Sequence, residues 1–273
     1  MIMWLLNFIP QILLSLLLAA WFTDTRAKVR GQGFYKFMLY LPNIITAASI
    51  SMLFLSIFGY PQGPINIALH KSFAANAQAE LATLVPGTEE YQQLLMQINN
   101  ETSGTVIFFD KTWWARGIIS FINFWMWYGN TMIVLIAGIL GISPSLYEAA
   151  QIDGANASQT FRRITLPLLR PILLYTLVTS LIGGMQMYDI PKIIAGSASS
   201  LLLARPKIVT VVVLISDLLG ASKNYAIASA ISVMLFVFTA MFSLILFYIM
   251  RDKDAAKLKK EEKAYKKALG KGM

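Results

Sequence analysis

The sequence predicts an all-α protein that crosses a lipid bilayer several times, and three observations support this fold class. Hydrophobic residues make up 56% of the 273 positions and charged residues 14%, whereas a soluble domain has about 45–50% and about 25%. Long apolar runs recur along the whole chain. Of the 23 basic residues, 16 lie in three segments between or after these runs. We therefore expect a single transmembrane domain over residues 1–273.

Five runs are near or above the ~20 residues that a membrane-spanning helix needs. They cover residues 1–22, 38–60, 117–142, 171–187 and 225–250. The fourth run is the shortest, because Asp189 and Lys192 follow it closely. A helix that is tilted or faces protein tolerates such an end, so we count it as a span.

The positions of the basic residues predict which loops share one side of the membrane. Segments 24–36, 143–170 and 251–273 carry the 16 basic residues noted above, and basic loops stay in the cytoplasm. The C-terminus is therefore expected in the cytoplasm, within a basic tail over 251–273. Segments 61–116 and 188–224 should lie on the opposite side, and 61–116 forms the long external loop.

A shorter apolar run over residues 208–219 competes as a sixth span. Twelve residues are too few, and Asp217 lies among them, so we expect an external or re-entrant helix. Five spans then place residue 1 outside. No basic residue precedes the first run, which therefore is not a signal peptide. We expect either an upstream helix or an amino terminus that is translocated without one.

Residue types exclude several kinds of chemistry. The chain has no cysteine, and His70 is its single histidine, so we expect no metal site. The phosphate-binding pattern Gly-x-x-x-x-Gly-Lys-Ser/Thr is absent, and no nucleophile and base pair stands out. We expect no catalytic residue and no enzyme activity, with energy supplied by another protein. The basic tail indicates anionic membrane lipids as its partner, and not nucleic acid.

The cytoplasmic segment 143–170 has strong local signals. The spacing of Ser145 and Glu148 predicts a capping box and a helix that begins near Leu146. Gly154 favours the left-handed conformation that ends a helix, and Asn156 or Ser158 can cap a second helix. That second helix should stop before Pro167.

Small side chains dominate the surface of this segment. They include Ala149, Ala150, Gly154, Ala155 and Ala157, and they would let the backbone of a partner approach closely. Phe161 and Ile164, spaced i and i+3, offer one apolar face. A docking surface is therefore predicted. Composition alone also permits an ordinary cytoplasmic loop whose alanines favour helix.

A long pattern decides between these two interpretations. It reads Glu148-Ala-Ala-x-x-Asp153-Gly154-Ala155, followed by Phe161-x-x-Ile164-x-Leu166-Pro167-x-Leu169-x-Pro171. This resembles the complete EAA loop of permease subunits in bacterial ABC importers. Other segments resemble the carbohydrate branch typified by maltose-type importers: Gly31-x-Gly33-Phe34-Tyr35-Lys36, Leu41-Pro42, Gly63-Pro-Ile-Asn66 and Asn224-Tyr-Ala-Ile-Ala-Ser-Ala.

The resemblance implies a six-span permease core in the bacterial cytoplasmic membrane, of which this chain holds five spans. Met1 falls where the second span should begin, and the external loop is longer than in the simplest members. The resemblance also implies partners: a second homologous permease, two ATP-binding subunits that hold ATP and Mg, and an external solute-binding protein. No cofactor is expected in this chain.

In the family, the EAA helix is a coupling helix that docks in a cleft of the ATPase subunit. Carried over residue by residue, the docking contact is Glu148, Ala149, Ala150, Asp153, Gly154 and Ala155, and Phe161 and Pro167 seat the helix against this chain. Glu148 is expected to face a basic group of the partner.

The expected cargo is a sugar or oligosaccharide, moved by alternating access. Trp127 and Asn130 lie in the span before the EAA loop, and Asn123, Trp127 and Asn130 share one helical face. Gln186 and Tyr188 lie at the outer end of the next span. In maltose-type permeases these regions line the sugar site, so the four residues Trp127, Asn130, Gln186 and Tyr188 are the predicted substrate path.

Other interpretations stay open at this point. The aromatic residues near Trp127 also fit lipid-interface anchors or core packing. The solute could be glycerol phosphate, a polyamine or phosphate, although neither an acidic nor a basic excess occurs within the spans. A membrane scaffold that binds a cytoplasmic partner without transport is a further alternative.

Overall fold

The computed structural model describes residues 2–24, 30–196, 208–220 and 222–250, and every regular element within these ranges is a helix. The predicted all-α fold is confirmed. The predicted basic tail over 251–273 lies outside the described residues. The helices named below, in chain order, are α1 (Ile2–Thr23), α2 (Gln32–Ile44), α3 (Ala47–Ile57), α4 (Pro64–Leu81), α5 (Glu89–Asn99), α6 (Thr112–Leu140), α7 (Pro144–Ile152), α8 (Ala157–Thr160), α9 (Leu166–Leu168), α10 (Arg170–Met185), α11 (Asp189–Ala195), α13 (Val211–Gly220) and α14 (Tyr225–Met250).

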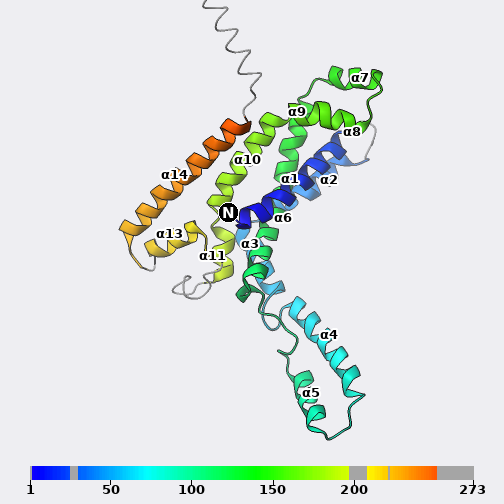
Figure 1. Ribbon diagram of the computed structural model, residues 1–273, viewed down its shortest axis with the longest axis vertical. Coiled ribbons are helices and arrows are strands. Elements are labelled where there is room, and N and C mark those ends of the chain that lie inside the picture. The colour runs from blue at the N-terminus through cyan, green and yellow to red at the C-terminus, as the bar shows by residue number, and fades with distance from the viewer. Residues whose placement is uncertain (1, 25–29, 197–207, 221, 251–273) are drawn as a thin grey trace, which may run out of the picture.

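Helices α1 and α6 pack along each other at the centre of the molecule (Figure 1). The buried side chains of α1 recur every three or four residues: Trp4, Asn7, Phe8, Gln11, Ser15, Ala19 and Phe22. Such spacing places them on one stripe. Leu13 and Leu17 on the other side of α1 are more than half exposed. One face of α1 therefore meets protein, and the opposite face is left for lipid or another chain.

The span expected over residues 38–60 is divided into two helices. The axes of α2 and α3 differ by 85°, because Ile45 is extended and Thr46 begins a new helix by accepting a hydrogen bond from the Ser49 amide at 3.2 Å. The Asn43 side chain donates to the Met126 carbonyl at 3.2 Å. This bond fastens the end of α2 to α6 near the bend.

Three described helices are individually long and apolar enough to cross a membrane, namely α1, α6 and α14. Two bent pairs would raise the number to five: α2 with α3, and residues 157–168 with 170–195. The sequence-based count of five spans remains a prediction. The short apolar helix expected near residues 208–219 is α13, of 10 residues.

Helix α14 packs against α10 and α13 at the margin of the bundle. Only 6% of its most apolar 18 residues are buried, although its composition is the most hydrophobic of the three long helices. Most of its surface must therefore meet lipid or a partner, because such apolar side chains are unfavourable in water.

The segment between α3 and α6 contains a helical hairpin formed by α4 and α5 (Figure 1). Asn66 is fully buried at its base, where its amide donates to the Gly59 and Val106 carbonyls at 2.9 and 3.1 Å and accepts from the Val106 amide at 2.8 Å. His70 donates from Nδ1 to the Ser103 carbonyl at 2.8 Å. These bonds close the hairpin.

The hairpin and the predicted coupling segment lie at opposite ends of the long axis. Figure 1 shows α4 and α5 at one end and α7 and α8 at the other, with α1, α6 and α10 between them. This arrangement agrees with the opposite sides that the basic residues predict for 61–116 and 143–170.

Candidate functional site

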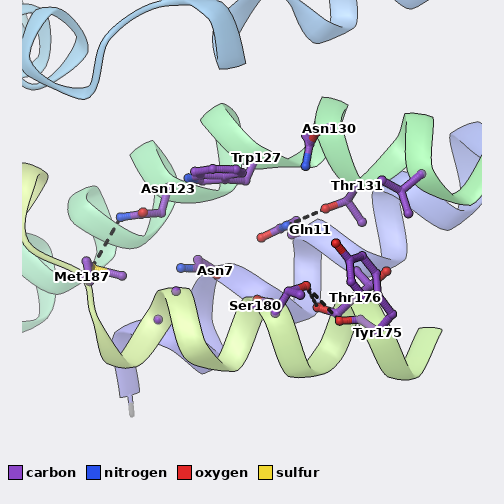
Figure 2. Close-up of a pocket in the computed structure, with 14 residues that line it drawn as sticks. Asn7, Gln11, Asn123, Trp127, Asn130, Thr131, Tyr175, Thr176, Ser180 and Met187 are labelled. Carbon is purple, nitrogen blue, oxygen red and sulfur yellow. Dashed lines mark hydrogen bonds between the residues drawn. The ribbon is translucent and has the colours of Figure 1, made fainter. Parts of the chain in front are cut away.

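A polar cavity of about 500 Å³ lies between α1, α6 and α10. Figure 2 shows side chains from these three helices around it. The lining residues are Asn7, Gln11, Asn123, Trp127, Asn130, Thr131, Val134, Tyr175, Thr176, Thr179, Ser180, Gly183, Gly184 and Met187. The cavity is thus built by helices that belong to three different candidate spans.

Helical periodicity brings the polar groups of each helix to this one space. Asn7 and Gln11 are one turn apart on α1, and Asn123, Trp127 and Asn130 are spaced by four and three residues on α6. Polar side chains inside membrane-length helices face protein or a cavity, because lipid cannot satisfy their hydrogen bonds. Both helices follow that rule here.

Hydrogen bonds hold several of these side chains in place. Gln11 donates from Nε2 to Thr131 Oγ1 at 2.7 Å, which joins α1 to α6 in the cavity wall. Trp4 donates from its indole nitrogen to Ser180 Oγ at 3.1 Å, which joins α1 to α10. The cavity walls are therefore fixed by contacts between helices, and Figure 2 shows the first of these bonds.

A more apolar groove of about 790 Å³ continues toward the coupling segment. Its lining includes the end of α6, the start of α7 and the start of α10, and it shares Val134 and Tyr175 with the polar cavity. The two spaces therefore meet at these two side chains. Together they lead from the middle of the bundle to α7.

The coupling segment turns sharply after α7. Gly154 has a φ of +75°, and its amide donates to the Gln151 carbonyl at 3.0 Å. The Ala155 amide donates to the Ala150 carbonyl at 2.9 Å. This pair of bonds is the Schellman motif, which satisfies the last carbonyls of a helix. The predicted helix end at Gly154 is confirmed.

The two predicted caps have different outcomes. Asn156 caps α8 through a capping box, in which its side chain and that of Gln159 each accept from the other residue's backbone amide at 2.9 Å. The box predicted at Ser145 and Glu148 is wrong. Helix α7 begins earlier, at Pro144 after Ser143, because proline fits the first helical position, where no amide donor is needed.

The helical path also continues past the expected stop before Pro167. A π-helical turn, η2, covers Phe161–Thr165, in which the Leu166 amide reaches back to the Phe161 carbonyl. The chain then stays helical through α9 and bends by 64° before α10. Pro167 is accommodated because it stands at the start of α9, where its missing amide breaks no regular bond.

The exposed face of the predicted coupling segment, residues 143–170, includes Glu148, Ala149, Asp153 and Gly154. Ile152, also on this face, is 87% exposed, which is exceptional for a large apolar side chain. Ala150 is buried, and Ala155, Phe161 and Pro167 are half-buried. The predicted contact residues therefore divide into an exposed group and a group that packs within this chain.

Sequence comparison decides the family. The model of a family described as "binding-protein-dependent transport system inner membrane component" matches residues 1–253.

The chain belongs to this family.

Curated relatives of this inner membrane component include the lactose transport system permease protein LacF of Rhizobium radiobacter. It is 30% identical over 179 residues, which are 66% of this chain and 50% of LacF. The trehalose/maltose transport system permease protein MalF of Thermococcus litoralis is 34% identical over 113 residues, 41% of this chain and 36% of MalF. The chain spans half or less of the first curated relatives that it matches.

Two solved structures share the fold of this inner membrane component. One is a bacterial ABC transporter involved in the import of the acidic polysaccharide alginate, with 23% identity and a TM-score of 0.59. The other is a bacterial alginate ABC transporter in complex with its alginate pentasaccharide-bound periplasmic protein, with 24% identity and a TM-score of 0.60. Each covers 89% of this chain and 71% of the chain compared.

Two of the four residues predicted for the substrate path lie on the cavity, and two do not. Trp127 and Asn130 line it. Gln186 is exposed beyond the end of α10. Tyr188 is half-buried, and its hydroxyl lies 3.1 Å from Ser216 Oγ of α13. Helix α10 ends at Met185, and of the three residues that follow it only Met187 lines the cavity.

Sequence reasoning missed the polar residues of α1. Asn7, Gln11 and Ser15 recur every four residues within an apolar run, and all three are buried. Ser15 donates to the Tyr128 carbonyl at 2.7 Å. This regular spacing was the signal that could have found them, since it marks one polar stripe on a membrane-length helix.

Proposed function

We propose that this chain is the permease subunit of an ATP-driven ABC importer, and that it moves a sugar or oligosaccharide across the bacterial cytoplasmic membrane by alternating access. The observation that carries this proposal is the polar cavity between α1, α6 and α10. Amide, hydroxyl and aromatic side chains line it within helices of membrane length. Such a lining suits a solute that carries many hydroxyl groups.

The family and the relatives support a sugar as the cargo. The family name describes transport that depends on a binding protein. LacF and MalF are named for lactose and for trehalose and maltose. A permease of this kind needs an external solute-binding protein, and the alginate transporter structure contains a periplasmic one.

The coupling segment supports a cytoplasmic ATPase as the source of energy. Its exposed face offers Glu148, small residues and the side chain of Ile152. ATP hydrolysis would occur in two copies of that ATPase, which would close against α7. A second homologous permease would complete the path, and the C-terminus would share the cytoplasmic side with α7.

Copurification of the chain with the other proposed subunits of the importer tests this proposal. We expect the chain to copurify with an ATPase, whose activity in lipid vesicles rises when a sugar-loaded binding protein is added. An ATPase that binds the chain but never responds to any loaded binding protein would favour a membrane scaffold instead.

A further inference from the structure

Asn7 has an unusual environment on the cavity wall. Only 5% of its surface is exposed, and it lines the cavity. Figure 2 shows its amide directed into the space between α6 and α10. No side-chain hydrogen bond holds this amide in the part of the chain that the structure describes, whereas Gln11, one turn further along α1, is held by Thr131.

The Asn7 amide opens onto the cavity and makes no hydrogen bond to a described side chain, so it is available to bind a ligand there. An asparagine amide offers donors on nitrogen and an acceptor on oxygen, and a sugar hydroxyl both donates and accepts. The two groups are therefore complementary at the position that Asn7 occupies.

The absence of charged side chains in the described cavity lining limits the class of ligand that it can hold. None of the described residues that line it is Asp, Glu, Lys, Arg or His. A carboxylate carried to this depth would lose its hydration and find no basic side chain there to balance it. Trp127, which is 47% exposed, provides an aromatic face for the apolar side of a sugar ring.

We propose that Asn7 is a specificity-determining residue that binds hydroxyl groups of an uncharged sugar, and that the cavity excludes acidic sugars. This inference rests on the proposed function and adds a residue and a substrate class to it. The alginate importer shares this fold but handles an acidic polysaccharide. Under this proposal the two proteins therefore differ in substrate class.

The absence of cysteine from the chain allows a direct test. Thr179 lines the cavity, and its hydroxyl donates only to carbonyls of its own helix, at 2.8 and 3.2 Å. Thr179→Cys therefore places a single reporter thiol in the cavity at little structural cost. Val85→Cys places a control thiol in the hairpin, outside the cavity, where the native side chain is 68% exposed.

The assembled importer in membrane vesicles is treated with N-ethylmaleimide, with lactose, maltose or digalacturonate as the probe. We expect lactose or maltose to slow the labelling of Thr179→Cys by at least about three-fold when most sites are occupied, and to leave the labelling of Val85→Cys unchanged. Digalacturonate should protect neither thiol. Adding Asn7→Leu, which keeps a side chain of similar size, should abolish the protection of Thr179→Cys.

Each contrary result has its own meaning. Undiminished protection with Asn7→Leu would overturn the role of Asn7, and protection by digalacturonate would overturn the uncharged substrate class. Uptake of lactose and maltose by the importer that carries the native chain is measured in the same vesicles. If the importer takes up sugar but the sugar does not protect Thr179→Cys from labelling, only the inference about Asn7 is contradicted. If the importer takes up no neutral sugar, the proposed function is contradicted as well.

Discussion

The Tyr147 hydroxyl lies 3.1 Å from Thr165 Oγ1, and this contact joins α7 to the π-helical turn η2. Thr165 is buried, with 5% of its surface exposed. Leu169, four residues later, donates its amide to the Thr165 carbonyl at 2.9 Å and is fully buried against α6. The contact therefore links the proposed docking helix to the base of α10.

Removing the contact between the Tyr147 and Thr165 hydroxyls should weaken the coupling of ATP hydrolysis to sugar uptake. We expect Tyr147→Phe to leave the importer assembled but to lower sugar uptake per ATP hydrolysed, because one neutral hydrogen bond contributes about 1 kcal/mol. Simultaneous measurement of uptake and phosphate release gives this ratio. Thr165→Val should act in the same way, and the double variant should be no worse than either single variant. Fully additive losses would show that the two hydroxyls act independently.

The exposed side chain of Ile152 should be an apolar anchor for the ATPase. Full burial of such a side chain is worth about 1.5–3 kcal/mol, so Ile152→Ser should weaken ATPase binding by roughly ten-fold or more. Val85→Ser is the matched control, since Val85 is 68% exposed at the opposite end of the molecule. Titration of the ATPase against each purified variant measures the difference. Equal binding by both variants would remove Ile152 from the contact.

Gly154 is a less informative position than Ile152 for testing the contact with the ATPase. Its φ of +75° strains any other residue whatever the space around it, and a Cβ there would meet nothing within 4 Å. A loss of coupling in a Gly154 variant could therefore come from backbone strain as well as from bulk at the contact.

Close packing of α2 on α6 should depend on Gly129. A Cβ at this position would collide with the Leu39 carbonyl oxygen and lie 2.9 Å from Tyr40 Cα, and backbone atoms cannot easily move. We expect Gly129→Ala to destabilise the protein by about 1–3 kcal/mol, measured as a lower melting temperature in detergent. Gly117→Ala on the same helix is the control, because its Cβ would meet nothing within 4 Å. A similar melting temperature for both variants would contradict the packing of α2 on α6.

Substitutions on and off the cavity should have different effects on uptake. Trp127→Ala removes an aromatic face from the cavity, and we expect uptake to fall about two- to ten-fold, in line with an aromatic contact of about 0.5–1.5 kcal/mol. Gln186→Ala should have little effect if the cavity is the whole path, because Gln186 lies outside it. A larger loss of uptake for Gln186→Ala than for Trp127→Ala would indicate that the substrate path runs along the outer end of α10.

The parts of the fold that depend on local composition were predictable. Apolar length indicated α1, α6 and α14, and the turn at Gly154 and the cap at Asn156 follow from backbone and side-chain chemistry at single residues. The bend between α2 and α3 was not predictable, because Ile and Thr also occur inside the unbroken helix α6 and the bend is fastened by the bond from Asn43 to α6. Contacts of that kind bring together residues far apart in the sequence.

The candidate site was predicted only in part for the same reason. Trp127 and Asn130 could be placed on one face of a helix by their spacing. Gln186 and Tyr188 follow the end of α10 at Met185, where the chain changes direction, so their sequence positions alone do not show whether they reach the cavity. The spacing of Asn7, Gln11 and Ser15 marks a polar stripe on α1, but the helices that this stripe faces follow only from the packing of α1 against α6 and α10.

Sugar uptake into proteoliposomes shows whether this chain forms the path of an ATP-driven sugar importer. Vesicles would contain the chain, its partner permease and the ATPase, with ATP on the ATPase side and labelled lactose or maltose delivered by the binding protein. We expect sugar to accumulate only when every component and ATP are present. Equal accumulation in vesicles that lack this chain, or none in the complete set with any sugar, would contradict it.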